Sequence, residues 1–134
     1  MRTPELLIVA EDLATRKQMV ELFTDTGYRV TAPASVAGAV QDILKQTVNV
    51  ALVSIRFNDL FATEVIPLLR RCKRDLTIIL VAGELPLAVL RKARREGIFY
   101  HALRPEQPGD EEELREAVRC AFDKAGQGSH GSSP

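Results

Sequence analysis

The stretches ELLIVA (residues 5–10), VNVALVSI (48–55) and TIILVA (77–82) decide the fold. Each is a nearly continuous apolar run of strand length, which is typical of parallel strands covered by helices on both faces. Two further runs, Tyr28–Ala32 and Ile98–Leu103, have the length of strands, and Tyr28–Ala32 is short and polar enough for an edge strand. The sequence therefore predicts a parallel sheet of five strands.

Amphipathic segments of helix length follow each of these five runs. They lie around residues 13–23, 36–44, 60–72, 87–93 and 110–125. We expect Pro67, inside the third segment, to kink that helix or to break its first turn. Alternation of strands and helices predicts a three-layer α/β/α sandwich, with the flavodoxin-like strand order 2-1-3-4-5.

Length and composition are typical of one intracellular domain. The chain has 134 residues, and we expect a domain over 1–125 and a disordered Gly/Ser tail or the start of a linker over 126–134. Its 18 basic and 18 acidic residues argue against nucleic-acid binding. No apolar run approaches the roughly 20 residues of a membrane helix. We therefore expect a cytoplasmic protein that binds neither nucleic acid nor membrane, with Cys72 and Cys120 as reduced, packed thiols.

Ligands of open parallel sheets bind at the carboxyl ends of the strands, so the residues there are the candidate site. These are Ala10, Glu11 and Asp12 after the first strand, Ser54 at the end of the third, Val81 at the end of the fourth and Arg104 after the fifth.

Four blocks of this sequence, in order, resemble those of the response-regulator receiver domain of bacterial two-component signal transduction. They are ELLIVAEDLATR (5–16), NVALVSIRFNDLFATEVIPLLRR (49–71), LTIILVAGE (76–84) and REGIFYHALRP (95–105). The resemblance extends from about Leu6 to Lys124. It implies phosphoryl transfer onto an aspartate that ends the third strand, with Mg²⁺ held by two acidic residues after the first.

This chain departs from that pattern at the residues that carry the chemistry. Ser54 stands where the resemblance places the phosphoacceptor, and Ala10 replaces one of the two acidic residues, leaving Glu11 and the adjacent Asp12. Ser54 and Ala10 thus remove two of the three anionic groups that the resemblance implies at this site. Mg²⁺ takes one or two carboxylates and relies on phosphate oxygens or water for the rest of its shell. We expect no metal, with Glu11 and Asp12 as the ligands if one binds, no cofactor and no enzymatic activity.

The switching positions that the resemblance implies are changed as well. Val81 replaces a hydroxyl residue, Arg104 replaces a lysine, and His101 occupies the position of the aromatic residue that moves on activation. The resemblance also implies a cis peptide bond between Arg104 and Pro105. We interpret the chain as a degenerate pseudo-receiver.

Several side chains of this site allow two interpretations. Arg104 either pairs with Glu11 across the cleft or is solvated, and Arg56 competes for Glu11. Ser54 is a kinase substrate or, in the simpler interpretation, a small hydrogen-bonding filler. Asp59 is a surrogate phosphoacceptor or the cap of a third helix that begins at Leu60.

The last two helices carry opposite charges. Arg91, Lys92, Arg94 and Arg95 lie on the fourth, and Glu111, Glu112, Glu113 and Glu116 on the fifth. In the resembling family, the face formed by the fourth helix, fifth strand and fifth helix commonly binds partners. With His101 at its centre, this face is the expected partner site, and its charges are self-complementary in an isologous homodimer. The simpler interpretation is that both helices are charged on their solvent side, with His101 a half-exposed polar residue rather than a pH sensor.

The leading hypothesis is a receiver-like interaction module that binds a kinase, a regulator or an output domain without being phosphorylated. One alternative is a working receiver whose acceptor is Asp12 or Asp59. Another is the amino-terminal receiver of a longer, truncated regulator. A third is a flavodoxin-like cofactor binder, which would need a Gly/Ser/Thr-rich phosphate loop in place of the acidic AEDLATR (10–16).

Overall fold

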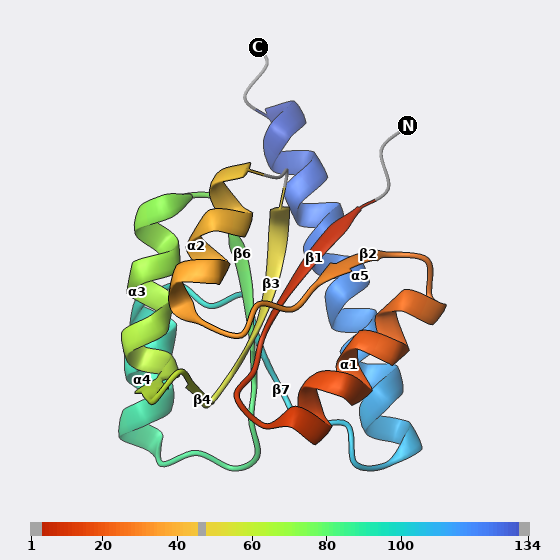
Figure 1. Ribbon diagram of the computed structural model, residues 1–134, viewed down its shortest axis with the longest axis vertical. Helices are drawn as coiled ribbons and strands as arrows, with labels where there is room; N and C mark the ends of the chain where they lie inside the picture. The colour runs from red at the N-terminus through yellow and green to blue at the C-terminus, as the bar shows by residue number, and fades with distance from the viewer. Residues whose placement is uncertain (1–3, 46–47, 132–134) are drawn as a thin grey trace.

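A computed structural model describes residues 4–45 and 48–131, and it has the predicted three-layer architecture (Figure 1). Five parallel strands form the sheet in the order β2-β1-β3-β6-β7, which confirms the predicted order 2-1-3-4-5. The strands are β1 Glu5–Val9, β2 Arg29–Thr31, β3 Val48–Ser54, β6 Thr77–Val81 and β7 Tyr100–Ala102. The helices are α1 Leu13–Asp25, α2 Val36–Lys45, α3 Ala62–Cys72, α4 Leu87–Arg95 and α5 Pro108–Gly131.

Alternate residues of each strand pack into two hydrophobic cores, one on each face of the sheet. In β1, Leu7 and Val9 pack in the core that α2, α3 and α4 cover. Leu6 and Ile8 face the core that α1 and α5 cover. The period of two along a strand explains this division, and burial on both faces explains why the strands are apolar throughout.

The segment between β3 and α3 differs from the prediction. It forms a two-stranded antiparallel hairpin, β4 (Arg56–Phe57) and β5 (Leu60–Phe61). Asn58 and Asp59 form its turn with φ of 55° and 65°, the left-handed region that such tight turns require. The expectation that Asp59 caps a helix from Leu60 is therefore wrong, because α3 starts at Ala62 with Phe61 as its N-cap residue.

Helix α3 is not broken at Pro67. The proline removes one backbone hydrogen bond, that to the carbonyl of Thr63. Burial of Val65, Ile66 and Leu69 on the inner side of α3 offsets this loss.

Two other features of the backbone bear on the predictions. Helix α5 continues to Gly131, past the expected domain end at residue 125, and the last three tail residues lie outside the described part of the chain. Cis peptide bonds are absent from residues 4–45 and 48–131, so the expected cis bond before Pro105 is wrong. Trans is the lower-energy form of such bonds by about 0.5–1 kcal/mol. Within the same residues, no helix combines the length and apolar character needed to cross a bilayer.

Candidate functional site

A cleft of about 420 Å³ opens at the carboxyl ends of β1, β3 and β6, where the sequence places the site. It is lined by Glu11, Asp12, Ser54, Val81 and Arg104, so the structure brings together five of the six predicted pocket residues. The sixth, Ala10, is fully buried in the core below.

Ser54 directs its hydroxyl group toward the backbone rather than into the cleft. The side chain is 9% exposed, and its Oγ lies 3.0 Å from the carbonyl oxygen of Arg56 and 3.3 Å from that of Val9. The single hydroxyl hydrogen is donated to one of these oxygens at a time. This geometry agrees with the filler interpretation, because the hydroxyl joins β3 to β1 and to the hairpin.

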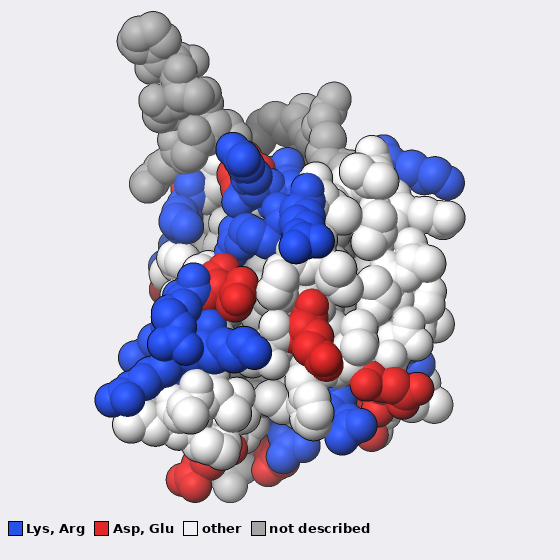
Figure 2. Space-filling view, turned by 90° about the vertical axis from the view of Figure 1, so that its left-hand side faces the viewer, with Lys and Arg blue, Asp and Glu red and all other residues white. Residues whose placement is uncertain are grey.

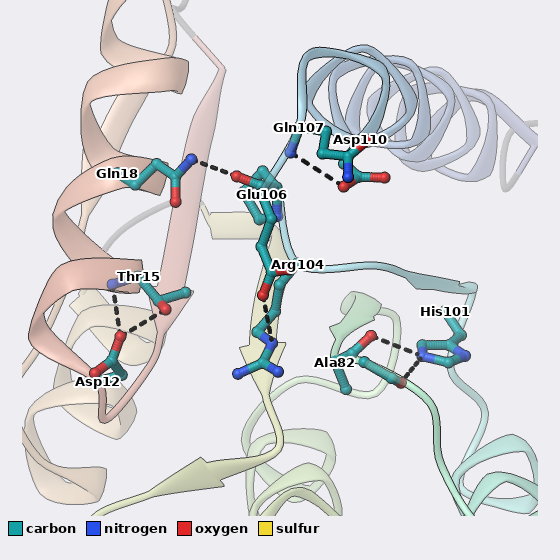
Figure 3. A network of polar contacts seen from close by, with 11 residues as sticks. Asp12, Thr15, Gln18, Ala82, His101, Arg104, Glu106, Gln107 and Asp110 are labelled. Carbon is teal, nitrogen blue, oxygen red and sulfur yellow. Dashed lines mark hydrogen bonds and ion pairs between the residues drawn. The ribbon is translucent and has the colours of Figure 1, made fainter.

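Asp12 is the N-cap of α1. Its Oδ2 accepts hydrogen bonds from the Thr15 hydroxyl at 2.7 Å and from the Thr15 backbone N–H at 2.9 Å. The hydroxyl bond, then the backbone bond and the charge of Arg104 lower the pKa of Asp12 below its ordinary value. The carboxylate is therefore engaged with its own helix (Figure 3).

Glu11 holds the hairpin and does not pair with Arg104. Its Oε1 accepts a hydrogen bond from the Asp59 backbone N–H at 3.0 Å, and its own N–H donates to the carbonyl of Arg56 at 3.2 Å. The Arg56 side chain instead lies 4.9 Å from the centre of the Phe61 ring. Of the two interpretations of Arg104, the structure agrees with the solvated side chain, because Glu11 accepts from the hairpin backbone instead.

Arg104 extends along the wall of the cleft from the loop after β7 (Figure 3). Its Nε is 3.9 Å from Oε1 of Glu106, an exposed and therefore weak pair. The same loop is anchored to α1 by a hydrogen bond from the Gln18 side chain to the carbonyl of Pro105. The loop is thus fixed by a backbone contact, while the guanidinium group remains largely in solvent.

His101 is tied to the neighbouring strand. Its Nε2 is 3.1 Å from the carbonyl oxygen of Ala82 and 3.2 Å from that of Gly83 (Figure 3). These contacts require a proton on Nε2. The half-buried ring therefore has backbone partners after β6 that the sequence did not reveal.

The cleft does not fit a divalent cation. Its two carboxylates already accept backbone or hydroxyl hydrogen bonds, at Glu11 and at Asp12. Ala10 and Val81 offer no oxygen ligand in their side chains. Within the described residues, no group of three or more His, Cys, Asp or Glu side chains is arranged to hold a metal.

The expected partner face is formed by α4, β7 and α5. The cations of α4 are exposed and make no ion pair within residues 4–45 and 48–131. On α5, by contrast, Glu112 pairs with Arg115 at 2.6 Å and Glu116 pairs with Arg119. The Tyr100 hydroxyl donates to Glu113 at 3.3 Å. Partial burial and this carboxylate raise the pKa of Tyr100.

A cavity of about 340 Å³ lies between β7 and α5 on the same face. Phe99, Tyr100, Ala117 and Cys120 contribute to its mostly apolar wall. This cavity could not be predicted from the sequence, because its shape depends on how α5 packs against the edge strand.

Three further residues of the site were missed by the sequence analysis. Thr15 follows Asp12 at the spacing of an N-cap contact, so a signal existed. Asn58, which accepts a hydrogen bond from the backbone N–H of Val36 at 3.0 Å, and Gln18 had no such signal. Their contacts are long-range and depend on the tertiary structure.

No protein-family model and no curated protein matches this chain. Solved structures do match it. One is a CheY-like response regulator receiver domain protein from Methanospirillum hungatei JF-1, 21% identical with a TM-score of 0.83, over 94% of this chain and 98% of that one. Another is the signal receiver domain of an HD domain-containing protein from Pseudomonas fluorescens Pf-5, 20% identical with a TM-score of 0.83, over 94% and 99%. The chemotaxis response regulator CheY4 of Vibrio cholerae is 16% identical with a TM-score of 0.74, over 87% and 99%.

These similarities show the fold: the chain has the architecture of the CheY-like receiver domains of two-component systems. At such identities the similarities say nothing of the chemistry of the site, which depends on the residues of this chain.

Proposed function

We propose that this chain is an atypical receiver-like protein of bacterial two-component signal transduction, acting in the cytoplasm as a protein-interaction module. It binds its partners without accepting a phosphoryl group and is not an enzyme. The observation that carries this proposal is Ser54, whose hydroxyl lies 3.0 Å from the carbonyl oxygen of Arg56 at the end of β3. The position that would carry the acceptor carboxylate thus has a structural role.

The rest of the cleft supports the same function. Val81 offers no hydroxyl at the end of β6, and Glu11 and Asp12 are engaged with the hairpin and with α1. The residues that line the cleft include two basic side chains, Arg56 and Arg104. A phosphoryl group would still bring at least one further negative charge next to the two carboxylates. Repulsion of this kind disfavours phosphorylation of the cleft.

The proposed partner-binding face is α4–β7–α5. It presents the exposed cations Arg91, Lys92, Arg94 and Arg95 on α4, and the cavity beside Tyr100 and Cys120. Glu113 and Glu116 line this cavity from α5, and Glu112 precedes them on the same helix. His101 contributes by its contacts with Ala82 and Gly83, which fix the strand on which the face is built. The partner is another signalling protein, with a second copy of this chain as an alternative.

Amide NMR spectra recorded with Mg²⁺ and then with beryllofluoride test this function. We expect no shifts around Glu11, Ser54, Val81 and Arg104, and no added phosphoryl mass after incubation with acetyl phosphate. Saturable shifts that spread to α4 and α5, or a gain of one phosphoryl group, would overturn the proposal. In that case Asp12→Asn and Asp59→Asn variants would identify the acceptor by the loss of the added mass.

A further inference from the structure

Six exposed cations cluster where the ends of α3 and α4 lie next to each other. Arg71 lies in the last turn of α3, and Arg74 follows that helix. The other four belong to α4: Arg91, Lys92, Arg94 and Arg95. None of them has a carboxylate within ion-pair distance in the part of the chain that the structure describes. Figure 2 shows Lys and Arg side chains in two neighbouring groups on this side of the molecule, with an acidic side chain between them. We call these six residues the α3–α4 cationic cluster.

Arg70 fixes the two halves of this cluster relative to each other. Its guanidinium group donates to the carbonyl of Arg74 at 3.0 Å, to that of Leu76, and to that of Gly97 at 2.7 Å. It thereby links the end of α3 to the residues that follow α4. The backbone positions of the two halves are therefore fixed relative to each other, and a ligand has only to order the exposed cationic side chains on binding.

The negative ends of the two helix dipoles account for only part of this arrangement. A cation in the last turn of a helix is favourable, typically by about 0.3–1 kcal/mol. Arg91 lies before the last turn of α4 and Arg74 lies beyond α3, so the dipoles do not account for them. The six cations also repel one another, and that repulsion is relieved when an anionic ligand binds. The cluster therefore favours an acidic partner.

Three acidic side chains of α5, unlike the six cations of the cluster, already have partners within the protein. Glu112 and Glu116 have arginine partners on their own helix, and Glu113 accepts a hydrogen bond from Tyr100. A second copy of the chain would have to break these contacts to bring Glu112, Glu113 and Glu116 of its α5 to the cluster. Charge complementarity consequently points to a different polypeptide.

We propose that the α3–α4 cationic cluster is the docking surface for an acidic segment of a partner protein that also carries apolar side chains. This inference rests on the proposed function as an interaction module and names the chemistry of its partner. Leu68, 37% exposed, precedes Arg71 by three residues on α3, and Leu87, 60% exposed, precedes Arg91 by four on α4. Residues at these spacings share one side of a helix, so apolar and cationic groups lie together.

The same surface is poorly suited to a nucleic acid. The chain as a whole is neutral, with 18 basic and 18 acidic residues, and so gives no long-range attraction to a polyanion. Glu96 adds a negative charge at the end of α4, next to Arg95. Leu68 and Leu87 match apolar side chains of a peptide rather than phosphate groups.

Fluorescence anisotropy tests the proposal with a labelled peptide of repeated Glu-Asp-Leu-Ala units. We expect binding that weakens with salt, and a Kd about tenfold higher for Arg91→Glu/Arg95→Glu. We expect Arg91→Gln/Arg95→Gln to raise the Kd by a smaller factor, because it removes the two charges without reversing them. The matched control Lys17→Glu/Lys45→Glu reverses two exposed lysines on α1 and α2 and should leave the Kd unchanged. Circular dichroism melting verifies that each variant is folded.

The inference is overturned if the peptide does not bind, or if both double reversals weaken it equally. It is also overturned if a DNA duplex, or vesicles containing phosphatidylserine, bind more tightly than the peptide. The same labelled NMR sample separates this inference from the proposed function. Shifts on α3 and α4 with peptide report the docking surface, whereas shifts around Ser54 with beryllofluoride report the cleft.

Discussion

Arg70 is a single side chain that joins three segments of the fold. Its half-buried guanidinium group donates to the carbonyls of Arg74, Leu76 and Gly97, and burial lowers its pKa although Asp75 and Glu96 oppose this. A guanidinium group has five N–H donors in a rigid plane, so it meets several carbonyls at once. An ammonium group at the end of a lysine cannot span the same three acceptors.

Replacing Arg70 should therefore destabilise the protein in a graded manner. We expect Arg70→Met, which keeps the apolar stem, to lower the free energy of unfolding by about 2 kcal/mol, because three carbonyls, that of Leu76 partly buried, lose a charged donor. Arg70→Lys should lose roughly half as much. Urea denaturation followed by circular dichroism measures both values. Equal decreases in the free energy of unfolding for the two variants would show that the planar arrangement of the donors does not stabilise the fold.

Asp12 makes the stability of the cleft depend on pH. Its pKa is lowered by the hydroxyl and backbone bonds from Thr15, so the ionised form stabilises the folded state. That contribution is complete above the ordinary pKa of 3.8 and is lost as pH falls through the lower, folded value. We expect Asp12→Asn, which still caps but cannot ionise, to lower the Tm at pH 7 and to converge with the wild type in acid. A Tm difference that stays constant down to the lowest pH would contradict this.

At the scale of elements, the hairpin β4–β5 links the cleft to α2. Asn58 takes φ of 55° in its turn and accepts the Val36 N–H, which belongs to the first turn of α2, at 3.0 Å. Asn58→Gly should lose the hydrogen bond but keep the backbone, at a cost of about 1 kcal/mol. Asn58→Ala should cost roughly 1–2 kcal/mol more, because alanine is strained in the left-handed region. Chemical denaturation of the two variants separates the loss of the hydrogen bond from the strain of the left-handed backbone. Similar free energies of unfolding for the two would show that this strain is absent.

The same hairpin shows where prediction from the sequence stops. The five strands of the sheet and the helices between them follow from local periodicity, because burial of one or both faces dictates the pattern of apolar residues. Their convergence on one cleft then follows from the topology. By contrast, the partners of Glu11 and His101 are backbone groups from loops distant in sequence, which residue type does not reveal. For Arg104 the sequence left two interpretations open, because opposite charges at one sheet edge indicate attraction but not distance.

At the scale of the whole molecule, the balance of charge hides an asymmetry. The chain has equal numbers of basic and acidic residues, yet the α3–α4 cationic cluster lacks ion pairs within residues 4–45 and 48–131, while α5 supplies its own. Neutral overall charge gives no general affinity for polyanions, so recognition depends on one surface. This arrangement suits a module that distinguishes partners by local charge rather than by net charge.

The asymmetry also bears on the oligomeric state. An isologous dimer that pairs α4 with the partner's α5 would lose the contacts of Glu112, Glu113 and Glu116 twice, once in each protomer. We therefore expect sedimentation equilibrium to give a monomer of 14.8 kDa at both low and high salt. A dimer at low salt that Arg91→Glu/Arg95→Glu abolishes would contradict this. It would mean that the intrahelical pairs of α5 open readily and that a second copy of the chain competes for the cations of α4.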